Sequence, residues 1–145
     1  MRLPWYVAAL GAALVWGLHY PLVGFALKRV SMVSVLFLTA LPIVLLAPFF
    51  YATLAADYSV LKTFPWPARA GVLALSITST AGAVLLFLSI AGKNATLAAL
   101  IEISYPVFVV LFAWLIFREV QVNASVIAGG LLVFTGVCLI IGNNP

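Results

Sequence analysis

Five long apolar segments make up most of the chain and constrain its fold more than any motif does. They cover residues 4–27, 31–54, 67–91, 95–117 and 122–141. Each has about 20 residues or more, enough for a helix rising about 1.5 Å per residue to cross a hydrocarbon core about 30 Å thick. None has the strictly alternating polarity of an outer-membrane barrel strand. The sequence therefore predicts an all-α membrane protein with five transmembrane helices.

The composition agrees with a chain that is embedded in lipid. Of the 145 residues, 66% are hydrophobic and 7% are charged, whereas about a quarter of a soluble domain is charged. The net charge of +4 comes from residues at the segment ends, which indicates membrane topology and not nucleic-acid binding. We expect one domain over residues 1–145, with a lipid bilayer as its surroundings and short links that make successive helices antiparallel.

The basic residues divide almost evenly between the two predicted membrane faces. The face with the amino terminus carries Arg2, Lys62, Arg69 and Arg118, and the opposite face carries Lys28, Arg29 and Lys93. Orientation normally follows an excess of Lys and Arg on the cytoplasmic face. Two interpretations therefore stay open: a weak preference for a cytoplasmic amino terminus, or insertion in both orientations.

Glu102 is the one acidic residue placed deep inside a predicted span, four residues before Pro106. A charged side chain at the centre of a membrane helix costs about 3 kcal/mol on insertion scales. Because proline has no N–H, Pro106 cannot bond the Glu102 carbonyl, and Pro21 cannot bond the Gly17 carbonyl in the first span. The sequence predicts helix kinks at Pro21 and Pro106.

His19 lies past the middle of the first span and Glu102 before the middle of the fourth. Because these helices run in opposite directions, both residues are displaced toward the same membrane face, each by about 5 Å, and they could meet. Trp16 and Tyr20 share a face with His19, and Tyr105 shares a face with Glu102.

An acid among aromatic rings suits an organic cation, through charge attraction and cation–π contact. Protonation of Glu102 would also suit proton-coupled exchange. The alternative is a structural role, in which Glu102 pairs with His19 or bonds the hydroxyls of the third span. Those hydroxyls belong to Ser76, Thr78, Ser79 and Thr80.

Small residues repeat along two predicted helices and predict close helix packing. The packing residues are Ala9, Ala13 and Gly17 in the first helix and Ser125, Gly129 and Gly136 in the last. The pattern leaves open whether the packing is within one chain or between chains. Asn94 and Asn123 open the last two helices, where we interpret both sequon matches as helix caps. Cys138 is interpreted as a packing residue.

Three sequence features together resemble the EamA-type domain of the drug/metabolite transporter superfamily. They are Trp16-Gly17, the Pro106-centred fourth helix that ends in Arg118-Glu119, and the run from Ile127 to Gly136. The resemblance covers the chain as a single five-helix repeat. It implies half of a ten-helix carrier, or, by similarity to the small multidrug resistance proteins, an antiparallel dimer. In EamA-type repeats an acid often directly precedes the fourth-helix proline, where this chain has Tyr105.

The predicted function is transport of a small organic metabolite or drug-like compound across a bacterial or archaeal inner membrane by a homodimer. Glu102 would bind a proton or a cationic group, His19 would modulate it, and Trp16, Tyr20 and Tyr105 would line the path. The alternative is a non-transporting membrane subunit or a lipid-handling partner of a larger complex. The sequence has no paired nucleophile and base, metal-ligand cluster or phosphate loop, so we expect neither an enzyme nor a cofactor or metal.

Overall fold

The computed structural model describes residues 4–120 and 122–144, and these residues form helices joined by short turns, with no strand among them. Arg2, which entered the count of basic residues, lies outside the described residues. Five helical runs are long and apolar enough to cross a membrane. The prediction of an all-α membrane protein with five spans is therefore confirmed.

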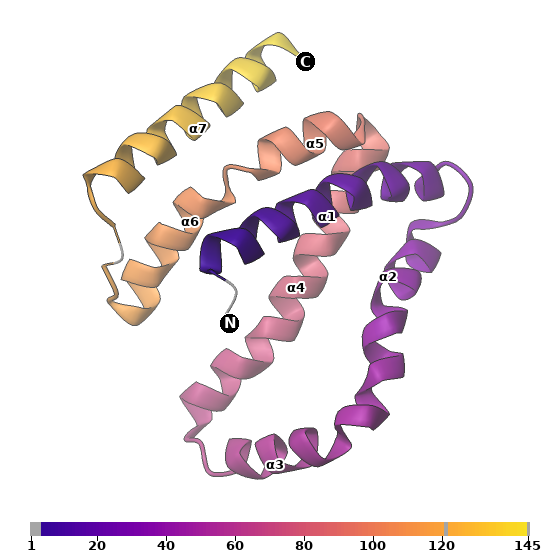
Figure 1. The fold of residues 1–145 in the computed structure, drawn as a ribbon, viewed down its shortest axis with the longest axis vertical. Coiled ribbons are helices and arrows are strands. Elements are labelled where there is room, and N and C mark those ends of the chain that lie inside the picture. Colours follow the sequence, from indigo (N-terminus) through magenta and orange to yellow (C-terminus); the bar gives the residue numbers. More distant parts are fainter. Residues whose placement is uncertain (1–3, 121, 145) are drawn as a thin grey trace. The chain divides into compact units, whose positions relative to one another are not determined.

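The five spans are built from nine helical pieces, and two of the spans are interrupted. The pieces are α1 (Trp5–Leu27), α2 (Met32–Leu46), the 3₁₀ turn η1 (Ala47–Phe50), α3 (Tyr51–Leu61), α4 (Trp66–Gly92), α5 (Ala95–Glu102), α6 (Tyr105–Phe112), the π-helical turn η2 (Ala113–Phe117) and α7 (Ala124–Asn143) (Figure 1). They divide into two compact units, one holding the described residues of Met1–Leu22 and Gly92–Pro145, the other Val23–Ala91.

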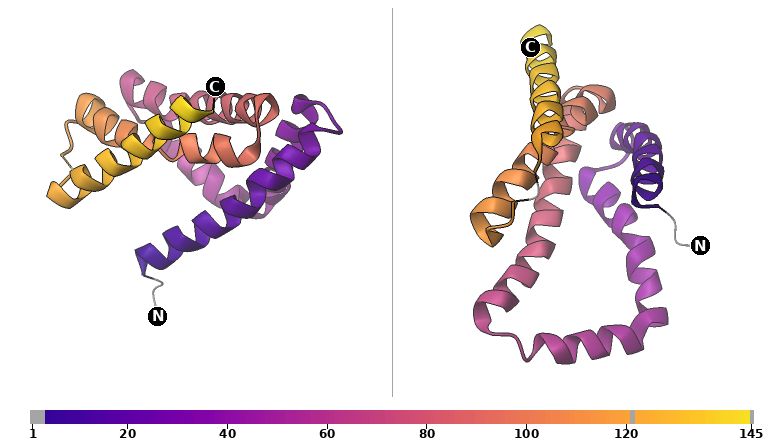
Figure 2. Two further views of the ribbon diagram at one scale, coloured as in Figure 1. Left: turned by 90° about the horizontal axis from the view of Figure 1, so that it is seen from above. Right: turned by 60° about the vertical axis from the view of Figure 1, so that its left-hand side comes forward.

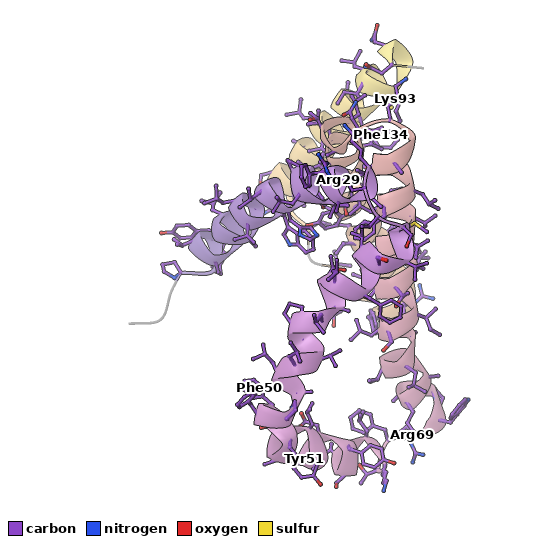
Figure 3. All side chains as sticks on the ribbon, turned by 90° about the vertical axis from the view of Figure 1, so that its right-hand side faces the viewer. Arg29, Phe50, Tyr51, Arg69, Lys93 and Phe134 are labelled. Atoms are coloured by element: carbon purple, nitrogen blue, oxygen red, sulfur yellow. The ribbon has the colours of Figure 1, made fainter. Side chains whose placement is uncertain are left out.

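The second span is longer than the sequence predicted. It runs over Met32–Leu61, so the expected helix end at residue 54 is wrong. Ala and Leu are strong helix formers, and the exposed Asp57 does not interrupt the helix that they extend. Pro48 instead tightens the chain into η1, where Figure 1 shows the sharp bend between α2 and α3, and Figure 3 labels Phe50 and Tyr51 at this corner.

The Arg69 side chain bonds the backbone of the short link from α3 to α4. The Arg69 Nε donates a hydrogen bond to the Phe64 carbonyl at 2.7 Å, and its terminal nitrogen donates to the Lys62 carbonyl. Figure 3 labels Arg69 beside this turn. The Lys62 ammonium lies 4.4 Å from the centre of the Tyr58 ring. These contacts keep the basic groups at one end of the two helices, where a membrane surface can accommodate them.

In the other unit α7 packs against α5 and α6, and Figure 2 shows these three helices from two further directions. A methyl group added at Gly130 would lie 3.8 Å from the Val107 side chain of α6. Ala98 of α5 and Val137 of α7 are buried. The close approach of α7 to α6 therefore occurs at Gly130, one residue beyond the predicted packing residue Gly129.

Asn94 and Asn123 cap the helices that follow them, as the sequence predicted. The Asn94 side chain accepts from the Leu97 N–H at 2.8 Å, and the Asn123 side chain accepts from the Val126 N–H at 3.0 Å. Each asparagine thus satisfies one of the backbone donors that a helix start leaves free. The caps fix where α5 and α7 begin.

Candidate functional site

Three aromatic rings gather on one face of α1. The Trp16 and His19 ring centroids are 5.1 Å apart with the rings at 89°, and the Trp16 and Tyr20 centroids are 5.8 Å apart at 35°. The His19 and Tyr20 centroids are 6.4 Å apart. The three- and four-residue spacing along the helix brings these side chains together. We call Trp16, His19 and Tyr20 the aromatic cluster.

The helix of the fourth span is interrupted between Glu102 and Tyr105 (Figure 1). At the interruption the Ser104 N–H bonds the Ile101 carbonyl and the Val107 N–H bonds the Ser104 carbonyl, both at 3.1 Å and both three residues back. Pro106 has no backbone N–H and so donates no hydrogen bond. The carbonyls of Glu102 and Ile103 therefore lose the donor that a regular helix supplies four residues later.

A hydrogen bond joins the aromatic cluster to the interrupted helix. The Tyr20 hydroxyl donates to Oε2 of Glu102, which lies 82 positions further along the chain, and both side chains are half-buried. The midpoints of the two spans, Trp5–Leu27 and Ala95–Phe117, fall at residues 16 and 106. Tyr20 and Glu102 each lie four residues, or about 6 Å, from these midpoints, toward the same membrane face. The hydrogen bond therefore lies within the membrane-spanning part of the molecule.

Within the described residues Tyr20, and not His19, is the side chain bonded to Glu102. His19 instead meets the Trp16 ring edge to face. Consecutive residues on a helix point about 100° apart, so only one of the two can face α5 directly. With the span bounds of the structure, Tyr20 and Glu102 lie equally far from their span midpoints, whereas His19 lies one residue closer. The predicted segments 4–27 and 95–117 do not distinguish the two residues.

The remaining predicted site residues are more open. Tyr105 is 60% exposed and Trp16 is 52% exposed. Pro21 lies within α1, which continues as a helix to Leu27. A methyl group added at Gly17, Gly129 or Gly136 would have nothing within 4 Å, and Ala9, Ala13 and Ser125 are exposed. Packing of these small residues against another helix or another chain therefore stays a prediction.

The hydroxyls of α4 are used within their own helix. Thr78 donates to the carbonyls of Ala74 and Leu75, at 2.9 and 3.1 Å, and Thr80 donates to the Ser76 carbonyl at 2.9 Å. Bonds of this kind satisfy a hydroxyl locally in an apolar setting. These two threonines therefore donate to backbone carbonyls of α4 and not to Glu102.

The fourth span ends in a second irregular turn, at Arg118. This residue has the left-handed backbone angle φ 58°, and it is followed by a bond from the Glu119 N–H to the Ala113 carbonyl at 3.2 Å. The Arg118 guanidinium lies 5.7 Å from the centre of the Trp114 ring. The turn thus closes η2 with a residue other than glycine, which is uncommon.

The described residues 4–120 and 122–144 contain no group of three or more His, Cys, Asp or Glu side chains that could hold a metal ion. Cys138 is exposed on α7. The polar chemistry of the site thus consists of a carboxylate, a phenol, an imidazole and the backbone groups of the interrupted helix.

The comparison with protein families matches residues 3–142 to the EamA-like transporter family. The comparisons with curated proteins and with solved structures each gave no match. The family match covers all five candidate spans and both irregular turns of the fourth span. With its five apolar spans, the chain is an integral, multi-pass membrane protein, and it belongs to the EamA-like transporter family.

Proposed function

We propose that this protein carries a small organic cation across a bacterial or archaeal inner membrane in exchange for protons, with Glu102 as the shared binding group. Members of the EamA-like family are membrane transporters of small molecules. The single observation that supports the finer assignment is the Glu102 carboxylate, held within a membrane span beside the aromatic cluster.

The chemistry of these groups favours a cation over an anion. A carboxylate attracts positive charge, and the faces of Trp and Tyr rings add cation–π attraction. The interrupted helix adds backbone carbonyls without their regular donors, and these are partners for a positive group. A proton and an organic cation would compete for the same carboxylate. This competition supplies the coupling.

We also propose that the working unit is a pair of chains in opposite orientations. The nearly even division of basic residues between the two faces supports this proposal, because it gives neither orientation a clear preference. The corrected end of the second span, at Leu61, leaves Lys62 on the face where it was counted. An inverted pair has the symmetric halves that alternating access requires.

Uptake into proteoliposomes tests the transport proposal. The probe is benzyltrimethylammonium, an aromatic cation whose charge does not change with pH, and benzenesulfonate serves as an aromatic anion. With an acidic lumen we expect uptake of the cation and none of the anion. Glu102→Gln should reduce cation uptake to that of protein-free liposomes at every pH. Asp57→Asn removes an exposed carboxylate elsewhere and should have no effect.

Two results would contradict the proposal. Absence of cation uptake by the wild-type protein would exclude the proposed substrate class. Equal uptake by wild type and Glu102→Gln would remove Glu102 from the mechanism. If the protein transports nothing but Glu102→Gln dissociates a larger membrane complex, the alternative role as a non-transporting subunit is favoured.

Labelling of single cysteines in intact cells tests the inverted pair. In a Cys138→Ser background, one cysteine is placed in the link at residue 30 and, in a second variant, at residue 63. Dual orientation predicts that an impermeant maleimide labels about half of the molecules at each position. Complete labelling at one position and none at the other would show a single orientation.

A further inference from the structure

The strength of the hydrogen bond between Tyr20 and Glu102 depends on the charge of Glu102. An ionised carboxylate only accepts hydrogen bonds, and here the phenol hydroxyl is the donor. Hydrogen bonds to an ionised acceptor are roughly twice as strong as those between neutral groups. The observed pairing is therefore strongest when Glu102 is ionised and has no other cation bound to it.

Both ligands proposed for Glu102 oppose this bond. A proton on the carboxyl group weakens the bond, because the carbonyl oxygen that remains is a weaker acceptor than a carboxylate oxygen. An organic cation that approaches the carboxylate meets the phenol already bound to Oε2. Tyr20 therefore competes with the proton and with the cation for one acceptor group.

The bond is also a link between helices. Within the described part of the chain it is the one side-chain hydrogen bond that joins α1 to α5, whereas α5 and α6 are held by packing against α7. Tyr20 precedes Pro21 within the continuous helix α1, and Glu102 ends α5 at the interruption of the fourth span. Release of the bond would therefore free α1 at the point where the neighbouring helix is already broken.

We propose that Tyr20 is a positioning residue that holds the ionised Glu102 in the empty carrier through a hydrogen bond that a proton weakens and a cationic substrate displaces. This inference rests on the transport function proposed above. A residue that only lines the path would not affect how a proton or substrate binds Glu102, whereas Tyr20 does so through its hydrogen bond. A substrate that takes Oε2 from the phenol also breaks this hydrogen bond between α1 and α5.

Few other titratable groups face this bond. His19 of α1 is part of the aromatic cluster, and Tyr105 begins α6. Of the described residues of α7, which packs against α5, only Cys138 can titrate, and α7 carries no charged side chain. The groups beside the bond that can change charge are therefore Glu102 and His19, and the variant His19→Asn separates their effects.

The first experiment follows the protonation of Glu102 in the ligand-free protein, so it needs no substrate. The side-chain carboxyl carbons of glutamate are labelled with ¹³C, the protein is placed in lipid nanodiscs, and the Glu102 signal is assigned by its loss in Glu102→Gln. In Tyr20→Phe the ionised form loses its donor, so the midpoint of the titration should move to higher pH by about one pH unit. Tyr6→Phe, the same change elsewhere on α1, should leave the midpoint in place.

The second experiment measures the affinity of benzyltrimethylammonium as a function of pH. In Tyr20→Phe the cation no longer has to displace the phenol, so it should bind severalfold more tightly at a pH where Glu102 is fully ionised. The same variant should need a higher pH to reach that affinity. A purely structural tyrosine would instead weaken binding at every pH.

An unchanged Glu102 titration in Tyr20→Phe, or weaker cation binding at all pH values, overturns the proposal. Its failure is distinguishable from failure of the transport function. If the titration shifts but no cation binds or crosses the membrane, Tyr20 positions Glu102 and the proposed substrate class is wrong. If the cation is carried and the titration does not shift, the transport function stands without a role for this bond.

Discussion

Two spans of equal length respond differently to the same dipeptide. Trp5–Leu27 and Ala95–Phe117 both have 23 residues, and each contains a Tyr-Pro pair, Tyr20-Pro21 and Tyr105-Pro106. The first span is one continuous helix, α1. The second is divided into α5, α6 and η2, with irregular turns before Pro106 and at Arg118.

The difference teaches that a proline alone does not divide a membrane helix. Pro21 removes one backbone bond, to the Gly17 carbonyl, and the helix continues. Around Pro106 the backbone bonds shorten to three-residue turns on both sides, and the residue whose carbonyl is freed also carries a carboxylate. Irregular backbone at membrane depth is tolerated where protein or a wet cavity satisfies it. This difference supports the proposal that a ligand binds at the interruption beside Glu102.

Removing the two prolines should separate their energetic roles, and this is the largest effect that we expect. Pro21→Ala restores the missing bond inside a continuous helix, and the free energy of unfolding should rise by about 2–3 kcal/mol. Pro106→Ala should raise it by less than about 1 kcal/mol, because Pro106 lies in the first turn of α6 and the new N–H reaches the Glu102 carbonyl only after the turns around it rearrange. Unfolding of both variants in bicelles measures the difference. An equal gain for both would mean that the two prolines are equivalent.

Transport should show the reverse order. Pro106→Ala gives the Glu102 carbonyl a donor and lets α5 and α6 form one helix, so uptake of benzyltrimethylammonium should fall about tenfold, equal to about 1.4 kcal/mol. Pro48→Ala, in η1, is the matched control and should transport normally. Normal uptake by Pro106→Ala would show that the interruption is dispensable.

The start of the divided span should be sensitive to its cap. Asn94→Ala removes the acceptor for the Leu97 N–H, and the free energy of unfolding should fall by about 1 kcal/mol. Asn94→Asp keeps an acceptor and should stay close to wild type in the same bicelle assay. If the alanine and aspartate variants are equally stable, the cap does not determine where α5 begins.

The end of the divided span should give the smallest effect. Arg118→Gly removes a left-handed strain of about 1 kcal/mol and also a contact with Trp114 of about 0.5–1 kcal/mol, so stability should hardly change. Arg118→Val keeps the strain and loses the contact, and it should be the less stable variant by about 1 kcal/mol. The opposite ranking in thermal unfolding would show that the turn is not strained.

The hydrophobic pattern predicts most of this fold, because only helices or closed barrels satisfy backbone groups in lipid. All five spans were predicted, and four of them agree with the structure to within about two residues at each end, the usual spread of helix boundaries. The end of the second span was missed because the predicted segment stopped at residue 54, before Asp57, although one exposed charge among strong helix formers leaves a helix intact.

The site was less predictable, because its geometry depends on which side of α1 faces α5. Helical spacing gave the aromatic cluster and the level of Glu102 in the membrane. It did not give the choice between His19 and Tyr20, since neighbouring residues differ by about 100° around the helix axis and rotation about that axis is set by packing. Within this chain α7 approaches α6 at Gly130, and the packing predicted for Gly129 stays a prediction.

Proton release on substrate binding tests the central claim most directly. Benzyltrimethylammonium is added to the purified protein in weakly buffered solution, at the pH where half of Glu102 is protonated, and a pH-sensitive dye records the protons released. If the proton and the cation exclude each other at Glu102, linkage predicts that wild type releases protons as it binds and that Glu102→Gln releases none. Binding by wild type without proton release would contradict the account.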